Sequence, residues 1–394
     1  MKILRSAFIF LFTLVVLLAV NQFFFCPRFQ FYKSAPFSGK TIYNPYESTK
    51  QHHWVKCNFH AHARSWNGIT NGHGTAIMIN SAYKSLKYGV HCVSNYQNID
   101  TTGCMEKSYI SAYEHGYNIN KTHQLVLGST KVQWLDYLFP QTLNNKQDVL
   151  NHLKSSHSII VLNHPQLRNG YTDSDFASLA GYDCLEVLNP SVISTGQWDA
   201  ALSAGKKVFV IGDDDLHNVI SKDRLGKMCT FIDVEENNKD LVLKALKSGD
   251  SYGVVIGDHQ NIDSIPYLKS LTIHTDTITI EVSQAAADIL ITGQNGKTLQ
   301  SFTRLGKVKF VLNKKDHYAR ATFGYKNGTR LFLNPVFYSG SDDINHHVIS
   351  ENLPETILFR SLGVIILFIW LLVMSKVFLC KKSHRYSSQW LVPK

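Results

Sequence analysis

The chain has 394 residues, of which 44% are hydrophobic, and it carries a formal net charge of +10 at pH 7. This length accommodates about two domains with a sizeable core, and the hydrophobic fraction is ordinary for a globular protein. The charge gives little support to a nucleic-acid partner, because no Lys and Arg cluster with interleaved aromatic residues stands out in the middle of the chain. Seven basic residues lie instead near the two ends: Lys2, Arg5, Lys376, Lys381, Lys382, Arg385 and Lys394.

Both ends of the chain contain a long apolar stretch. Residues 7–25 form 19 uncharged residues, enough to cross a hydrocarbon core of about 30 Å, and the missing small-x-small pattern before Cys26 favours an uncleaved anchor (1–26) over a signal peptide. A second transmembrane helix is predicted over 356–380, followed by a basic tail (381–394); a buried core helix is the alternative. The flanking charges predict cytosolic termini and a central domain outside the cytosol, in the periplasm, although Arg28, Lys33 and Lys40 weaken this argument.

The region between the two spans divides into three parts. Residues 27–51 show no helical or alternating period, which predicts a linker that lifts the next domain off the membrane. Residues 52–258 alternate short apolar strands with helices, a pattern typical of a parallel sheet or barrel. The strands are expected at 54–59, 90–93, 159–162 and 208–211, and the helices at 75–88, 148–155, 198–204 and 238–247.

The character of the chain changes after residue 258. Short alternating strands separated by Gly and Asn turns, for example at 271–273, 278–282, 289–291, 308–311 and 318–323, predict a small all-β sandwich over 259–350, here named the β-module. The seven cysteines suggest no disulfide framework, although Cys92 and Cys104 could form a bridge.

Residues that commonly bind metals follow three predicted strands. His60 and His62 are two apart at the end of one apolar run, and Asp215 and His217 repeat this spacing after another. His164 follows the buried run 159–162. Side chains two apart in a strand point to the same side, and the carboxyl ends of parallel strands meet at one face of a barrel. The sequence therefore predicts a metal site there.

Taken in order, these residues resemble the PHP (polymerase and histidinol phosphatase) family of metal-dependent phosphoesterases. The resemblance covers about residues 52–257 and implies a distorted (β/α)7 barrel. His60-Ala61-His62 matches the opening motif of the family, His164-Pro165 the His-Pro motif, and Asp215-Leu216-His217 the closing motif. Glu114 resembles the metal-bridging glutamate of the family, and His123 resembles its next histidine ligand.

The resemblance implies a set of metal ligands: His60, His62, Glu114, His123, His164, Asp215 and His217. Three family positions differ, because Asn67, Asn95 and Tyr96 stand where family members have Asp, Asp and His. Amide and phenol groups are poor ligands for such cations, so we expect two divalent ions, Zn, Mn or Fe, in place of three.

Two hypotheses about the function follow from these ligands. The leading one is hydrolysis of a phosphate ester by a hydroxide that two metal ions activate, with Asp215 and His217 as catalytic residues and a phosphorylated small molecule or nucleotide as substrate. The alternative is an inactive PHP-like membrane protein that binds a ligand or partner. His115 or His73 could replace a lost ligand, but a solvent-facing loop histidine is favoured for each.

Several further residues are candidates for supporting roles. Arg64 and Arg168 follow ligand histidines and could clamp a phosphate group. Glu186, inside an apolar run, could support a metal ligand or form a structural salt bridge. Lys131 is interpreted as a solvated charge, and Asp213 and Asp214 as loop acids that raise the local negative potential.

Overall fold

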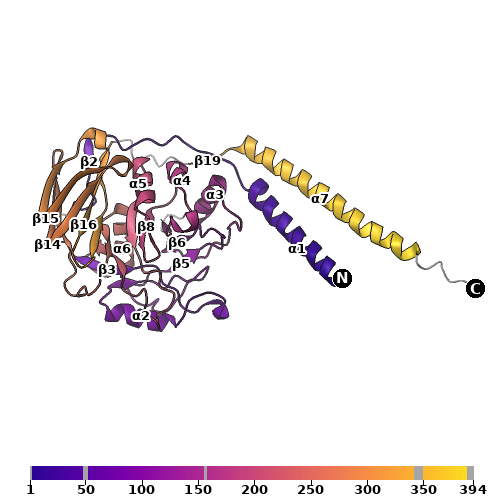
Figure 1. The fold of residues 1–394 in the computed structure, drawn as a ribbon, viewed down its shortest axis with the longest axis horizontal. Helices are drawn as coiled ribbons and strands as arrows, with labels where there is room; N and C mark the ends of the chain where they lie inside the picture. The colour runs from indigo at the N-terminus through magenta and orange to yellow at the C-terminus, as the bar shows by residue number, and fades with distance from the viewer. Residues whose placement is uncertain (1, 48–51, 155–157, 341–348, 388–394) are drawn as a thin grey trace, which may run out of the picture.

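The computed structural model describes residues 2–47, 52–154, 158–340 and 349–387 of the chain (Figure 1). A mixed α/β body holds the central residues, and two long helices project from it side by side. The N-terminal and C-terminal ends therefore lie on the same side of the body.

Seven short strands are linked in a cycle around the ligand residues. They are β3 (Trp54–Asn58), β4 (Val90–His91), β5 (Ala112–His115), β6 (Gln124–Leu127), β7 (Ile159–Leu162), β8 (Cys184–Asn189) and β10 (Phe209–Gly212). Neighbours β3–β4, β7–β8 and β8–β10 are parallel, whereas β5–β6 and β6–β7 are antiparallel. Two single bridges, Tyr96 to Glu114 and Ala61 to Leu216, join the remaining neighbours.

This arrangement differs from a regular alternation of parallel strands and helices. Residues 116–123, all of them described, connect β5 to β6 without a helix. A connection of eight residues is too short for a parallel crossover, so the two strands must run in opposite directions. The short strand β9 (Val192–Ile193) pairs with β8 at the edge of this sheet.

Five helices accompany the strands. They are α2 (Ala76–Ser85), α3 (Leu143–Leu153), α4 (Asp173–Ser178), α5 (Thr195–Ser203) and α6 (Lys239–Ser248). Local sequence accounts for their ends, because Thr75 caps α2 by accepting from the Met78 N–H, and Asn238 caps α6 in the same way. Gly249 ends α6 with φ 78°, a conformation that favours glycine. The expected helices at 75–88, 198–204 and 238–247 correspond to α2, α5 and α6. The expected helix at 148–155 overlaps α3, which begins five residues earlier, and residue 155 lies outside the described residues.

The β-module continues a sheet of the central domain. Its strands are β13 (Leu268–His274), β14 (Thr277–Thr292), β15 (Thr298–Val311), β16 (Tyr318–Gly324), β17 (Arg330–Leu333) and β18 (Val336–Ser339). Strand β12 (Ser251–Val255) pairs on one side with β11 (Met228–Asp233) and on the other with β17. One 11-stranded sheet therefore extends from β4 in the central domain to β13 in the β-module. The sequence predicts instead that the β-module is a separate unit.

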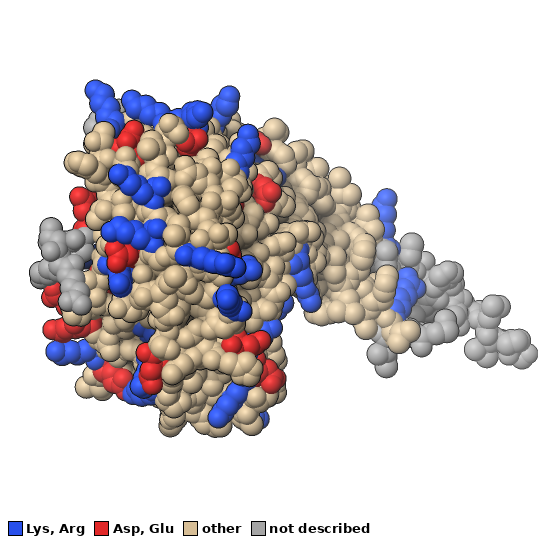
Figure 2. All heavy atoms as spheres, turned by 60° about the vertical axis from the view of Figure 1, so that its left-hand side comes forward, with Lys and Arg blue, Asp and Glu red and all other residues tan. Residues whose placement is uncertain are grey.

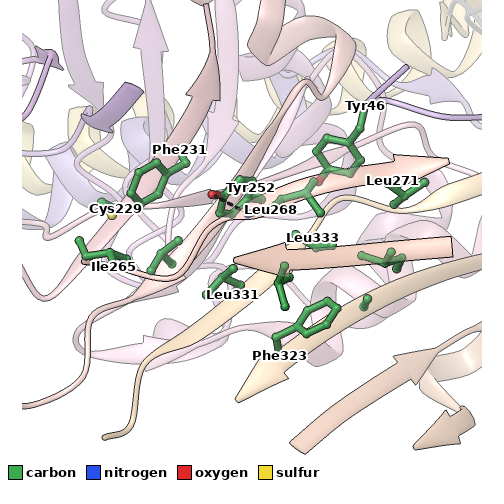
Figure 3. Packing of buried hydrophobic residues seen from close by; sticks show 14 of the residues in the cluster. Tyr46, Cys229, Phe231, Tyr252, Ile265, Leu268, Leu271, Phe323, Leu331 and Leu333 are labelled. Atoms are coloured by element: carbon green, nitrogen blue, oxygen red, sulfur yellow. Dashed lines mark hydrogen bonds between the residues drawn. The ribbon is translucent and has the colours of Figure 1, made fainter. Parts of the chain in front are cut away.

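The two parts also share a hydrophobic core. Figure 3 shows side chains from β11, β12, β16 and β17 packed against one another, among them Phe231, Tyr252, Phe323, Leu331 and Leu333. Complete burial of such a side chain contributes about 1.5–3 kcal/mol. The predicted strands 278–282 and 289–291 form one strand, β14, whose register shifts between Glu281 and Ala286.

Residues 27–47, expected to act as a linker, pack against the body. Strand β1 (Phe29–Gln30) pairs with β19 (Ser350–Glu351), and β2 (Thr41–Tyr43) pairs with β18. Phe37 and Tyr46 are buried. Residues 48–51 of the predicted linker lie outside the described residues.

The two projecting helices are long and apolar enough to cross a membrane. They comprise α1 (Lys2–Val20) with the π-helical turn η1 (Asn21–Phe25), and α7 (Leu353–Ser387). Their apolar windows, 4–25 and 353–376, have mean hydropathies of 2.4 and 2.6, and only 11% and 6% of these windows is buried. Figure 2 shows few charged side chains on the projecting part, whereas Lys and Arg are interspersed with Asp and Glu over the body. A core helix of a soluble protein would be mostly buried.

Cys92 and Cys104 are both free thiols, so the bridge considered from the sequence is not present.

Candidate metal centre

Two groups of buried ligand side chains lie at the ends of the seven linked strands. The first group is His60, His62 and Asp215, and the second is Glu114, His123 and His164. Within each group the ligand atoms lie within 4.8 Å of one another. All six residues are buried. These six residues, together with His217, are called the metal centre below.

Glu114 lies between the two groups and turns one carboxylate oxygen toward each. Its Oε2 atom is 3.3 Å from His60 Nε2 and 3.2 Å from His62 Nε2. Its Oε1 atom is 2.8 Å from His123 Nδ1 and 3.4 Å from His164 Nε2. A carboxylate with nitrogen ligands on both sides is placed to bridge two cations, the role that the family resemblance implies for Glu114.

Asp215 connects the first group to His217. Its Oδ1 atom is 3.4 Å from His60 Nε2 and 3.2 Å from His217 Nε2. The His217 ring stacks on the His62 ring with centroids 4.5 Å apart. The side chain of His217 is 22% exposed, against 8% for Asp215, so His217 lies on the solvent side of the centre.

Two ligands occupy unusual backbone conformations. Asp215 has φ 44° and His164 has φ 28°, values that side-chain-bearing residues rarely adopt. Such a conformation costs on the order of 1–3 kcal/mol and persists only where the surrounding structure enforces it. In both cases the chain turns sharply soon after a buried strand, β10 or β7, which directs the ligand into the centre.

Hydrogen bonds from buried neighbours orient the ligands. Glu186 on β8 contacts His60 Nδ1 through Oε1 at 2.8 Å and accepts from the His164 backbone N–H through Oε2 at 2.8 Å. A carboxylate at Nδ1 leaves Nε2 free for a metal, so these contacts match the predicted support of a metal ligand. Asn163 donates to Glu114 Oε1 at 3.1 Å, and Asn189 donates to Asp215 Oδ2 at 3.2 Å.

Opposite charges compensate one another in the buried cluster. Burial alone raises the pKa of Glu114, but His123 and His60 hold it well below its usual range. Burial likewise raises the pKa of Asp215, and His60 outweighs it, so that this pKa is also well below its usual range. Burial lowers the pKa of His60, yet Asp215 and the other carboxylates raise it well above its ordinary value. The carboxylates of Glu114 and Asp215 are therefore ionised, and they are paired with positive charge on the neighbouring histidines. Divalent cations can supply this positive charge in place of the protons.

The three positions that depart from the family pattern take other roles. Asn95 accepts a hydrogen bond from the Ala63 N–H at 2.8 Å, so its amide supports the backbone. The Tyr96 ring stacks on His62 with centroids 4.5 Å apart. Asn67 lies in an exposed turn with φ 53°.

The predicted phosphate-binding arginines lie outside this cluster. Arg64 and Arg168 are both exposed, and Arg168 donates to the carbonyl oxygen of Ile119 at 3.5 Å. In the part of the chain that the structure describes, no hydrogen bond or ion pair joins either guanidinium to a metal-centre residue. Their role in substrate binding stays a prediction.

Other predicted residues are accounted for by local contacts. Lys131 and His73 are exposed. His115 is buried, and its two ring nitrogens contact Gln124 Oε1 at 2.7 Å and the Leu135 carbonyl at 2.9 Å, so it is neither a solvent-facing loop residue nor a free ligand.

The interpretation of Asp213 and Asp214 as loop acids is wrong, because both are buried and structural. Asp213 accepts from the Phe59 N–H at 2.7 Å. Asp214 accepts from three consecutive backbone N–H groups at residues 226–228 and from the Tyr83 hydroxyl, which fixes the loop after Asp215. Burial nevertheless raises the pKa of Asp214 to about 7.

Arg224 is a candidate that the sequence did not single out. Its Nη1 atom donates to Asp215 Oδ2 at 3.2 Å, and its Nη2 atom donates to Ser191 Oγ at 2.7 Å. The side chain is 33% exposed, so one edge of the guanidinium faces solvent beside the metal centre. Nothing in the sequence around Arg224 signals this position, because it depends on the loop that Asp214 holds.

Comparison with known proteins gives one structural neighbour. No family model and no curated protein matches the chain. The crystal structure of a two-domain protein containing a predicted PHP-like metal-dependent phosphoesterase from Bacteroides vulgatus superposes with a TM-score of 0.38 at 13% identity, over 79% of this chain and 93% of that one. Similarity at this level carries no argument about function, which therefore rests on the geometry of the site.

Proposed function

We propose that the protein is a membrane-anchored, metal-dependent phosphoesterase of the PHP type that hydrolyses a phosphate ester with two divalent ions. The observation that carries this proposal is the position of Glu114, buried between two groups of ligands with one oxygen toward each. The cycle of seven strands with ligands at its edge supports a distorted (β/α)7 barrel as the underlying fold.

The donor set fits a pair of divalent cations. His60, His62, Glu114 and Asp215 would hold one ion, and Glu114, His123 and His164 the other. Oxygen Oε2 of Glu114 is buried and, although His60 Nε2 and His62 Nε2 lie 3.3 and 3.2 Å away, makes no hydrogen bond among the described residues, which is costly unless a cation satisfies it. Histidine-rich ligation with carboxylates suits Zn, Mn or Fe. When bound, such a pair activates water for attack and withdraws charge from the phosphoryl oxygens.

Residues at the solvent side of the centre would handle the substrate. The partly exposed His217 lies within reach of a leaving oxygen and can transfer a proton to it. Arg224 is held by Asp215 and Ser191, which leaves donors on its exposed edge for a phosphate oxygen. Glu186 positions His60 and His164 and does not itself meet the substrate.

The two apolar helices support a membrane anchor at both ends of the chain. Only 11% and 6% of their windows is buried, and the basic residues flanking them favour cytosolic termini with the body in the periplasm. The body is held directly on the first anchor, because Gln22 in η1 is buried and hydrogen-bonded to Phe139.

The test uses the full chain in non-ionic detergent, since residues 29–47 pack against the body. Metal content and hydrolysis of p-nitrophenyl phosphate and bis(p-nitrophenyl) phosphate would be measured beside His60→Ala. Two bound metals and activity lost in the variant are expected. Three metals per chain would contradict the two-metal mechanism. A folded protein that holds no metal after reconstitution with Mn, Zn and Fe would favour the alternative of an inactive binding protein.

A further inference from the structure

Two exposed tryptophans border the metal centre. Trp66 is 45% exposed and Trp134 is 59% exposed, and their rings meet edge to face with centroids 5.9 Å apart. Trp66 also donates its indole N–H to the carbonyl oxygen of Tyr96 at 2.8 Å. Because Tyr96 stacks on the ligand His62, a single residue separates this aromatic pair from the metal centre.

Further exposed apolar side chains come from the loop of Trp66 and from the loop between β5 and β6. Ile69, 87% exposed, lies one turn after Trp66. Tyr117 and Ile119, each 49% exposed, lie in the loop that joins Glu114 to His123. Trp66, Ile69, Tyr117, Ile119 and Trp134 are called the apolar rim below. Several large apolar side chains exposed around one site mark an interaction surface, because soluble proteins rarely leave them there without a use.

Hydrogen bonds connect the apolar rim to the end of the first anchor helix. In the loop of Tyr117 and Ile119, the Asn118 amide donates to the Tyr137 carbonyl at 2.7 Å and to the Phe139 carbonyl at 2.6 Å. The buried Gln22 side chain accepts from the Phe139 N–H at 2.9 Å and donates to the Phe139 carbonyl at 3.0 Å. Trp134 and Phe139 are five residues apart, which limits their separation to about 18 Å.

The second anchor helix meets the first at the same level. The Arg28 N–H donates to Thr356 Oγ1 at 2.9 Å, and Arg360 Nε donates to the Phe25 carbonyl at 3.2 Å. Arginine side chains near the ends of apolar helices are typical of the boundary between hydrocarbon and water, because they can extend to the headgroups. The apolar rim is therefore held near the bilayer surface by fixed contacts, without a flexible tether.

Cationic side chains accompany the apolar rim. The Lys121 amino group lies 5.8 Å from the centre of the Tyr96 ring, and Arg168 donates to the Ile119 carbonyl. Apolar side chains beside cationic ones match a ligand that carries a hydrocarbon chain next to a phosphate group.

We infer that the substrate is an amphiphilic phosphate ester from the bilayer, whose hydrocarbon chain lies against the apolar rim while its phosphate group reaches the metal centre. This inference rests on the proposed phosphoesterase function and specifies its substrate class. In the reaction, water attacks phosphorus, the bond from phosphorus to an ester oxygen breaks, and the leaving oxygen receives a proton, giving an alcohol and a phosphate. A water-soluble sugar phosphate has no hydrocarbon chain that the rim would bury.

The test compares esters that share a head group and differ in the hydrocarbon chain. The full chain in non-ionic micelles would be given glycerol 3-phosphate or oleoyl lysophosphatidate, and glycerophosphocholine or oleoyl lysophosphatidylcholine, with 31P NMR as readout. The chain-bearing member of at least one pair should have a kcat/KM about tenfold higher or more, because burial of a few methylene groups suffices for this.

A rim variant separates substrate preference from general damage. Ile69→Ser combined with Trp134→Ser should lower the ratio of lipid to soluble rates about fivefold or more, and Ile119→Ser provides a second variant. Tyr267→Ser removes an aromatic side chain that is 44% exposed in the β-module and should change neither rate.

The outcomes distinguish this inference from the proposed function. Equal rates within both pairs, with p-nitrophenyl phosphate still hydrolysed, would overturn the lipid substrate and leave the phosphoesterase in place. A lipid preference that the rim variants do not reduce would overturn the role of the apolar rim. If no ester were hydrolysed, p-nitrophenyl phosphate included, the proposed function and this inference would both fail.

Discussion

Strand β3 has a histidine and carboxylate cluster near each of its ends, and the two clusters differ in construction. Beyond the carboxyl end lies the metal centre, and before the amino end lie His52, Asp233 and Asp250, whose ligand atoms are also within 4.8 Å of one another. This second cluster is half-buried, and none of its residues has a positive φ. His52 is ion-paired with Asp233, which also accepts from the His53 N–H at 2.6 Å.

The comparison shows how a candidate metal site differs from a cluster of similar residues that has a structural role. In the metal centre a carboxylate between two groups of ligand type, oriented rings and two strained backbone positions direct donor atoms toward common points. In the second cluster, where β3, β11 and β12 begin or end, His52 and Asp233 pair with each other, and Asp250 Oδ1 is buried without a hydrogen-bond partner among the described residues. Proximity of ligand-type residues is therefore a weaker indicator than burial together with hydrogen bonds that orient the donors.

The strongest test of this comparison replaces one carboxylate in each cluster by the corresponding amide. Glu114→Gln should remove at least one bound metal and reduce phosphoester hydrolysis about a thousandfold or more, because the amide cannot bridge two cations. Asp250→Asn should leave the metal content unchanged. Both are measured by elemental analysis and hydrolysis of p-nitrophenyl phosphate. Loss of an ion in Asp250→Asn would show that the second cluster also binds metal.

A smaller effect is expected from the residue that orients His60. Glu186→Gln removes the negative charge at His60 Nδ1, and such a change typically weakens metal affinity about 10- to 100-fold. The affinity would be measured by competition with a chelator. The partly exposed Glu281 on β14, far from the metal centre in the sheet order, provides the control Glu281→Gln, for which no change is expected. Equal affinities in both variants would contradict the supporting role of Glu186.

Metal affinity should also depend on pH. The carboxylates raise the pKa of His60 above its usual value of 6.5, so that a proton competes with the metal well into the neutral range. Affinity should fall as the pH is lowered from 8 to 6, by about tenfold per pH unit for each proton displaced. Calorimetric titration in buffers of different ionisation enthalpy counts the released protons. Binding that is independent of pH would exclude this competition.

The smallest effect concerns the second cluster. Burial and the nearby Asp233 raise the pKa of Asp250 to about 7, whereas an unfolded aspartate has a pKa of about 3.9. Folding therefore favours the protonated form of Asp250. The resulting contribution to the free energy of unfolding is complete below pH 4 and is lost as the pH rises through 7. Asp250→Asn should be more stable than the native chain at pH 8, by about 2 kcal/mol after allowance for solvent screening, with a flatter profile between pH 5 and 8.

Thermal unfolding in detergent, followed by circular dichroism, measures this profile. Asp258→Asn is the matched control, because that side chain is 83% exposed and should not alter the curve. A native profile that does not fall between pH 5 and 8 would contradict the assignment to Asp250.

Features that depend on neighbouring residues could be predicted from the sequence. The run 159–162 alone indicates β7, and the spacing of His60 and His62 alone places both rings on one side of an extended chain. The two apolar spans were likewise evident, because helix length and hydropathy are local properties. Helix ends at Thr75 and Gly249 follow from local capping.

Features that depend on distant residues were decided by the tertiary structure. The pairing of β12 with β17 makes one sheet of two predicted parts, and the packing of Phe37 and Tyr46 turns an expected linker into part of the body. Arg224 reaches Asp215 only because buried Asp214 holds residues 226–228. Local periodicity determines which side a residue faces, whereas the partner it meets is determined by pairings across the whole chain, and those carry no local signal.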